Sequence, residues 1–177
     1  MRRDVRRLVP HPATWRAILS GSSDLCLSQL IFCRPPQVPT AYLTRRITFA
    51  AAHRYSRPEW SDEKNESVFG LCARPSYHGH SYMCDVTVRG EIDPLTGFVM
   101  DLGVLDRILD VEVKQRFDHR NINLDVPEFA DGALVPTGEN LARFISERVQ
   151  ASLPPENRVT EVKVAEDRTL SATYRVD

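Results

Sequence analysis

The sequence predicts an α+β fold in which an antiparallel four-stranded sheet carries two helices on one face. Segments with an apolar residue at every second position, typical of half-buried strands, occur in two groups separated in the chain. Two segments with apolar residues at helical spacing lie between these groups. The resulting order of strand, strand, helix, helix, strand, strand suits a sheet with helices on one side.

The first two strands are expected at residues 45–53 and 80–90. Their apolar residues of one parity are Ile47, Phe49 and Ala51 in the first segment and Tyr82, Cys84, Val86 and Val88 in the second. His53 continues the parity of the first segment, and His78 and His80 share that of the second. Residues 56–67 between them are expected to form a polar loop.

The remaining elements follow from turn composition and periodicity. Residues 93–97 have the composition of a turn, and the apolar segment 98–100 after them predicts a hairpin. The first helix carries Leu102, Leu105, Ile108, Leu109 and Val113 at helical spacing. The second is expected to open at Thr137, and the closing strands at residues 162–166 and 171–176.

Composition limits the classes of protein that the chain can represent. A formal net charge of −1 gives no sign of a nucleic-acid or anionic membrane partner, and no apolar run reaches the length of a membrane-spanning helix. Four cysteines are too few for a disulfide framework, which favours reduced thiols and a cytoplasmic protein.

An N-terminal extension is expected over residues 1–40, with one domain at residues 41–177. Residues 1–46 contain eight Arg and only two acidic residues, and they end near a proline-rich connector. This weakly patterned segment predicts little stable structure. An organelle transit peptide, or a start codon assigned too far upstream, are alternative interpretations.

Three histidines are candidate metal ligands. His78 and His80 flank one glycine, and because side chains alternate along a strand, both imidazoles point to the same side. His53 ends the other strand on its apolar parity and offers a third nitrogen. Three histidines without a nearby fourth Cys or His leave an open position for water or substrate, as at catalytic zinc. The alternative is a satisfied polar edge of a strand.

Two cysteines of the domain receive different interpretations. Cys72 lies six residues before His78 and is expected on a loop beside the metal, where a cation or Arg74 would favour its thiolate form. Such a thiol could act as a base, and a fourth zinc ligand or an inert thiol are the alternatives. Cys84 lies in mid-strand among apolar residues and is expected in the core.

Two acidic positions are also candidates. Asp118 precedes His119 where the first helical region ends, and a carboxylate there could orient the imidazole for proton transfer. The alternative is an ordinary surface pair. Glu166 continues the parity of Val162 and Val164, so its carboxylate should seek donors such as those of a guanidine-like heterocycle. A helix cap or salt bridge is the alternative for Glu166.

From about Arg45 to Arg175 the chain resembles the family of 6-pyruvoyl-tetrahydropterin and 6-carboxy-tetrahydropterin synthases. The segments that carry this resemblance are 45–54, 69–72, 78–80, 90–97, Asp118–His119, 125–131, and Thr137 with Glu139 and Asn140. They span essentially the whole domain. Because several separate motifs agree, the resemblance is highly specific.

The resemblance implies a zinc site, a proton relay and a pterin pocket. The zinc ligands would be His53, His78 and His80. The proton-abstracting base would be Cys72, with Asp118 and His119 completing its relay. The pterin ring would be anchored by Glu166, helped by Thr137 and Glu139.

The family's fold and reaction follow as expectations. The fold would be the tunnelling fold, in which strands of three subunits close a barrel and two trimers stack into a homohexamer with active sites between subunits. The reaction would be that of a zinc-dependent carbon–oxygen lyase of tetrahydrobiopterin biosynthesis, converting 7,8-dihydroneopterin triphosphate to 6-pyruvoyl-tetrahydropterin with loss of triphosphate. Arg45, Arg46 and Arg54 are candidates for binding the triphosphate.

The sequence also departs from the family pattern. Ala73, Arg74, Ser76 and Tyr77 stand where the animal pyruvoyl synthases typically have an Asn-rich, Gly-containing loop. The five residues between Cys72 and His78 nevertheless match those enzymes, whereas the 6-carboxy-tetrahydropterin synthases of queuosine biosynthesis usually have a shorter interval. A branch that cleaves the side chain to a hydroxymethyl pterin typically has Glu in place of this Cys. The 6-carboxy synthase, a non-catalytic zinc-stabilised pterin-binding oligomer and a plain zinc hydrolase remain alternatives.

Overall fold

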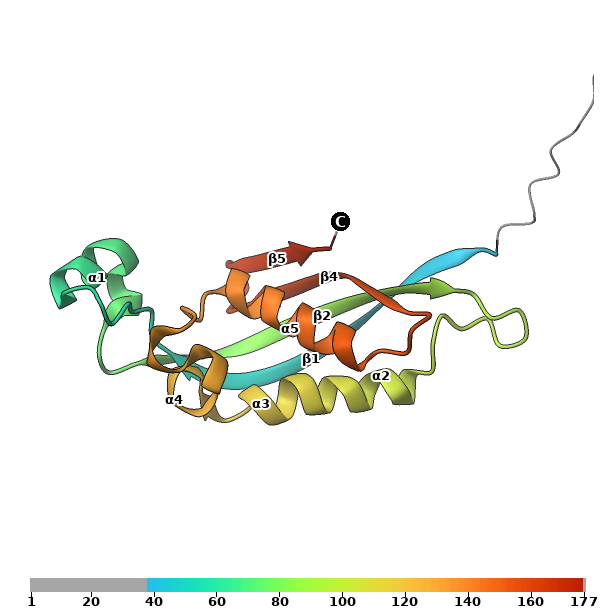
Figure 1. Cartoon of the computed structure of the whole chain (residues 1–177), viewed down its shortest axis with the longest axis horizontal. Coiled ribbons are helices and arrows are strands. Elements are labelled where there is room, and N and C mark those ends of the chain that lie inside the picture. The colour runs from blue at the N-terminus through green and yellow to red at the C-terminus, as the bar shows by residue number, and fades with distance from the viewer. Residues whose placement is uncertain (1–37, 177) are drawn as a thin grey trace, which may run out of the picture. The chain divides into compact units, whose positions relative to one another are not determined.

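The computed structural model describes residues 38–176, which form one sheet with helices on one face (Figure 1). The strands are β1 (Thr40–His53), β2 (His78–Glu91), β3 (Arg120–Asn121), β4 (Arg158–Ala165) and β5 (Ser171–Arg175). The α-helices are α1 (Asp62–Phe69), α2 (Leu102–Leu109), α3 (Gln115–Phe117), α4 (Ile122–Asp125) and α5 (Gly138–Ser152). Shorter turns are η1 (Gly70–Ala73), η2 (Asp110–Lys114) and η3 (Pro127–Gly132). The extension expected over residues 1–40 lies almost wholly outside the described residues, so it stays a prediction.

The sheet has the strand order β3-β1-β2-β4-β5. β1 and β2 pair antiparallel along their whole length, and the last pair of this ladder joins His53 to His78. β4 pairs antiparallel with β2, and β5 with β4. The four antiparallel strands expected from the sequence are thus present. The fifth strand, β3, was not predicted, because two residues running parallel to β1 beside Ala51 and Ala52 are too short to show alternation.

Two local predictions are wrong. Residues 56–67 are not all loop, since α1 begins at Asp62 with Ser61 as its N-cap; this helix is polar, so periodicity did not reveal it. Residues 98–100 form no strand. Because β2 already pairs with β1 on one edge and β4 on the other, it offers no free edge for a hairpin partner.

The two predicted helices are confirmed and lie on the same face of the sheet (Figure 1). The first comprises α2, the π-helical turn η2 and α3, and it begins after Asp101, whose carboxylate accepts the Val104 backbone N–H. The second, α5, begins after Thr137, whose hydroxyl accepts the Asn140 backbone N–H. Each capping oxygen satisfies a backbone donor that the first helical turn leaves unpaired.

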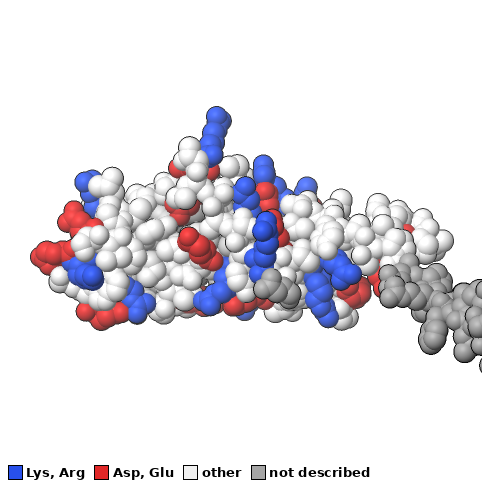
Figure 2. All heavy atoms as spheres, turned by 90° about the horizontal axis from the view of Figure 1, so that it is seen from above, with Lys and Arg blue, Asp and Glu red and all other residues white. Residues whose placement is uncertain are grey.

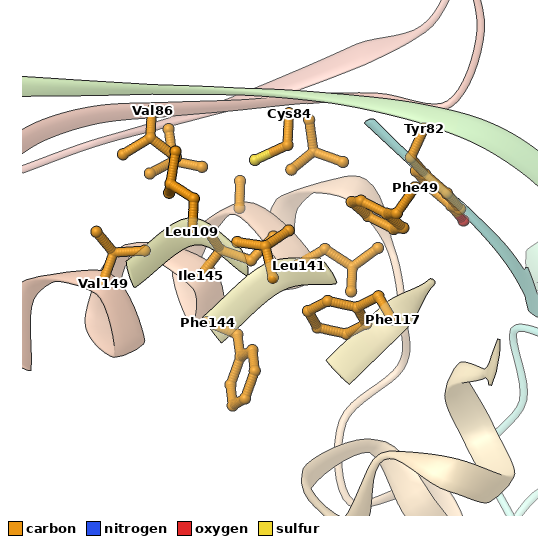
Figure 3. Close-up of a cluster of buried hydrophobic side chains, with 14 of the residues drawn as sticks. Phe49, Tyr82, Cys84, Val86, Leu109, Phe117, Leu141, Phe144, Ile145 and Val149 are labelled. Atoms are coloured by element: carbon orange, nitrogen blue, oxygen red, sulfur yellow. The ribbon is translucent and has the colours of Figure 1, made fainter. Parts of the chain in front are cut away.

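The hydrophobic core lies between the sheet and these helices (Figure 3). Strand residues of the predicted parity point toward α2, α3 and α5, and Cys84 is fully buried among them, as expected. The rings of Phe49 and Tyr82 stack with centroids 4.8 Å apart, and Phe117 also stacks on Phe49, with centroids 5.4 Å apart. Such stacked pairs add to the stabilisation from buried area. The core thus anchors the strand ends that carry the histidines.

One carboxylate is buried between the first helix and α5. Glu112 is only 7% exposed, and it accepts hydrogen bonds from Arg116, Arg148 and Ser152. Burial alone would raise its pKa, but the donors of Arg148, Ser152 and Arg116 outweigh burial and hold the pKa of Glu112 below its ordinary value. Glu112 is therefore a buried anion satisfied by two helices.

Charged side chains of both signs are interspersed on the face drawn in Figure 2. Two of the proposed triphosphate ligands are already paired within the chain: Arg45 with Asp106 at 2.7 Å and Arg46 with Asp85 at 2.6 Å. Among residues 38–176, no helix is both long and apolar enough to cross a bilayer.

Candidate functional site

The three predicted histidines meet at one end of the sheet. His53 and His78 face each other across the β1–β2 ladder with their Nε2 atoms 3.0 Å apart, and His80 lies two residues further along β2 on the same side. One ligand atom from each histidine lies within 4.8 Å of the others. The His53 Nδ1–H donates to the carbonyl of Pro136 at 3.0 Å, which leaves Nε2 with its lone pair free.

The group has the chemistry of a metal site. His80 Nε2 is buried and has no hydrogen-bond partner among the described residues. Two imidazole nitrogens as close as those of His53 and His78 need a proton or a cation between them, because their lone pairs would otherwise repel. A metal ion would satisfy all three nitrogens at once, with ligand atoms about 3.3 Å apart for four-coordinate zinc. The three histidines therefore fit a metal ion.

His53 makes the metal-free protein sensitive to acid. Burial, together with the neighbouring His78 and His80, lowers the pKa of His53 from 6.5 to about 4. As pH falls below 6.5 the unfolded chain takes up a proton that the native His53 does not accept until about pH 4. The free energy of unfolding should therefore fall by up to about 3 kcal/mol over this window. Urea unfolding of metal-stripped protein at pH 7 and 4.5 measures the fall, and the fall should be smaller in His53→Gln. Equal falls in the two proteins would contradict this assignment.

Glu166 lies beside the histidines, and Cys72 lies near Glu166. Cys72 is half-buried in η1, and its carbonyl accepts the backbone N–H of Tyr55 at 2.8 Å. Burial, and then the charge of Glu166, raise the pKa of the Cys72 thiol. Without a cation the side chain is therefore a thiol, and the lowering of its pKa expected from the sequence requires the metal.

Glu166 follows β4 and is 6% exposed. Its Oε1 accepts a hydrogen bond from the Tyr55 hydroxyl at 2.8 Å, and its Oε2 lies 3.8 Å from His80 Nε2. The carboxylate is thus neither a helix cap nor part of a salt bridge to Lys or Arg among the described residues. It faces the histidine group, as its parity predicted.

A cavity of about 310 Å³ opens beside Glu166. Thr137 and Glu139, at the start of α5, line it together with Tyr55 and Phe69. The structure therefore brings all three predicted pterin-binding residues to one cavity. Thr137 also caps α5, so part of its hydrogen-bonding capacity is used in the helix. The volume lies within the range of small-molecule sites.

Asp118 and His119 occupy a different place. They lie at the β3 edge of β1, where Asp118 Oδ1 accepts the Ala50 N–H at 2.9 Å and the His119 N–H donates to the Ala50 carbonyl. His119 Nδ1 is 3.2 Å from Asp118 Oδ1, and the His119 side chain is 83% exposed. The Ala50 N–H, more than His119, keeps the pKa of Asp118 below its ordinary value. Among residues 38–176 neither side chain hydrogen-bonds to Cys72 or to the three histidines.

Arg54 is the one triphosphate candidate next to the histidines. Its Nε donates to the Ala73 carbonyl at 2.7 Å, and its Nη2 lies 3.6 Å from Asp62. Arg45 and Arg46 lie seven or more residues earlier in β1, or about 23 Å along the strand. Within one chain they are therefore remote from the histidines.

Tyr77, directly before His78, adopts the left-handed backbone conformation, with φ of 55°. That region disfavours residues with a Cβ by about 1–2 kcal/mol. Tyr77→Gly should therefore be more stable than Tyr77→Ala by about 1 kcal/mol, although both lose the same ring. Chemical denaturation of the two variants measures the difference. A more stable alanine variant would show that this turn is unstrained.

Two tyrosines of the site were not predicted. The Tyr82 hydroxyl lies 3.0 Å from His53 Nδ1, and its parity with His78 and His80 could have revealed it. Tyr55 gave no such sign, because its bond to Glu166 joins residues 111 positions apart.

A one-sided sheet with three convergent histidines that could hold a metal ion fits the tunnelling-fold class. The family model described as 6-pyruvoyl tetrahydropterin synthase matches residues 42–177. The chain belongs to this family.

Individual relatives agree with this placement. The chain is 46% identical to 6-pyruvoyl tetrahydrobiopterin synthase of Homo sapiens over 114 residues, covering 64% of this chain and 77% of the relative. It is 44% identical to the enzyme of the same name from Poecilia reticulata over 131 residues, covering 72% and 88%. The structure of Caenorhabditis elegans 6-pyruvoyl tetrahydropterin synthase matches with a TM-score of 0.73 and 32% identity, over 79% of this chain and 98% of that one. The family, fold and lyase class expected from the sequence are confirmed.

Proposed function

We propose that this protein converts 7,8-dihydroneopterin triphosphate to 6-pyruvoyl-tetrahydropterin with elimination of triphosphate, as a step of tetrahydrobiopterin biosynthesis. One observation carries the proposal beyond family membership. The buried Glu166 carboxylate lines a cavity, lies next to three histidines that fit a metal ion, and is near enough to the Cys72 thiol to raise its pKa. In this reaction the ring gains the two electrons that its side chain loses, so no external reductant is needed.

We propose zinc as the metal, held by His53, His78 and His80. When bound, zinc would supply Lewis-acid polarisation of the substrate's side-chain hydroxyls. Glu166 would accept N–H donors of the pterin ring, and Glu139 and Thr137 would complete the cavity around it. Cys72 would then take a carbon-bound proton from the side chain.

The relay from Asp118 and His119 would come from a second copy of the chain. In one chain this pair lies at the β3 edge, where His119 is exposed and neither side chain has a hydrogen bond to Cys72 among residues 38–176. On the edge away from β2, β1 has no strand partner from Thr40 to Phe49 within residues 38–176, and the outer edge of β5 has none either. Edges of this kind can continue a sheet into a neighbouring subunit. This supports the trimeric barrel and the homohexamer, with sites between subunits.

A zinc-supplemented assay with 7,8-dihydroneopterin triphosphate tests the proposal. Triphosphate release is followed and the pterin product is identified by mass. A 6-pyruvoyl product is the expected result. A 6-carboxy product with acetaldehyde would place the protein in the queuosine branch. No release from folded, zinc-loaded protein would favour a pterin-binding oligomer without turnover.

A further inference from the structure

Tyr55 links the two groups that the proposed function relies on. Its backbone N–H donates to the Cys72 carbonyl, and its hydroxyl donates to Glu166 Oε1, both at 2.8 Å. Its ring packs edge-on against His53, with centroids 4.8 Å apart, and against Phe69 at 5.9 Å. These contacts hold the ring in place from three sides. Tyr55 therefore presents its hydroxyl to Glu166 from a fixed position.

Glu166 stands where it could perform two different tasks. Its Oε2 lies 3.8 Å from His80 Nε2, whereas two ligands of a four-coordinate zinc ion lie about 3.3 Å apart. Oε2 is thus close to one of the three histidine nitrogens, and a movement of the carboxylate toward the other two would make Oε2 a fourth ligand and close the position that substrate needs. Carboxylate oxygen is a common ligand of zinc beside histidine. In the structure the hydroxyl of Tyr55 holds Oε1 on the side of the cavity.

We propose that Tyr55 is a positioning residue, which holds the Glu166 carboxylate for the substrate and keeps it from ligating the metal at the three histidines. The inference rests on the proposed function for the identity of the substrate. The part of the inference that concerns ligation of the metal depends only on the contacts of Tyr55, Glu166 and His80. A hydrogen bond to a buried carboxylate corresponds to about a tenfold to hundredfold effect on the equilibrium that it controls.

Tyr55→Phe keeps the ring and removes the hydroxyl. Co²⁺ is titrated into metal-stripped protein in competition with a chelator, and its visible absorption reports the ligands. We expect the variant to bind Co²⁺ about tenfold more tightly than wild type, with an altered spectrum. In the assay of triphosphate release, the factor by which KM rises should exceed the factor by which kcat falls. Tyr42→Phe, which removes an exposed hydroxyl at the far end of β1, should match wild type in every measurement.

The double variant Tyr55→Phe/Glu166→Gln identifies the new ligand. If Glu166 moves to the metal, the gain in Co²⁺ affinity should disappear when Glu166 is replaced. An unchanged affinity and spectrum in Tyr55→Phe would overturn the inference, and so would a gain that persists without Glu166. The Co²⁺ measurements use no pterin, so a failure of the proposed reaction is distinguished from a failure of this inference.

Discussion

Cys72→Ala should lower kcat by about 10³-fold while the protein still binds one metal ion per chain. The thiol lies near Glu166 and does not belong to the group of three histidines that fits a metal. Loss of a general base typically costs between about 10² and 10⁴ in rate. Triphosphate release under saturating substrate measures kcat, and metal analysis of the purified variant measures occupancy.

Cys84→Ala is the matched control for this prediction. It removes the other thiol of the domain from the buried core, so it should cost stability and leave kcat near that of wild type.

Oligomers mixed from Cys72→Ala and His119→Ala chains should recover part of the lost activity if the relay is shared between copies. Full activity in Cys72→Ala would remove the thiol from the role of base, and loss of metal would make it a ligand.

Glu112→Ala should lower the free energy of unfolding by about 3 kcal/mol. The carboxylate is 7% exposed and accepts hydrogen bonds from Arg116 at 3.1 Å, from Arg148 at 3.0 Å and from Ser152 at 3.1 Å. Alanine would remove the acceptor of the Arg148 guanidinium and leave Arg116 with only the more distant Glu128, at 3.7 Å, in partly buried surroundings, which is costly. Urea denaturation at neutral pH measures the loss.

Glu161→Ala is the control for Glu112. Glu161 pairs with Arg175 at 2.8 Å, but the Arg175 side chain is 75% exposed, so this pair should contribute less than about 1 kcal/mol. If the two variants lose similar amounts of unfolding free energy, burial of Glu112 does not strengthen its ion pairs.

Much of the fold was predictable because burial imposes a period on the sequence. The alternation from Ile47 to His53 and from His78 to Val88 predicted two strands, and it placed three histidines on one side. Thr137 and Glu166 were found in the same way, at a helix start and a strand end. These predictions need only local spacing.

The rest depended on contacts between distant parts of the chain. The bond of Tyr55 to Glu166, and the support of Asp118 by Ala50 across 68 positions, leave no periodic trace. α1 escaped prediction because its residues face water on most sides, and β3 because it has two residues. The sequence therefore indicated which side chains carry the chemistry more clearly than how they are held.

The π-helical turn η2 sets the angular position of the Asp118–His119 pair. Leu105, Leu109, Val113 and Phe117 are all buried at a uniform spacing of four residues. An ordinary α-helix would rotate such a row away from the core by about 40° at each step, and one wide turn takes up this drift. Without this wide turn, the same residues wound as a regular α-helix would carry everything after η2 about 100° further round the helix axis. Phe117 would then leave the core and Asp118 would leave the edge of β1, so the placement of the pair depends on the wide turn that precedes it.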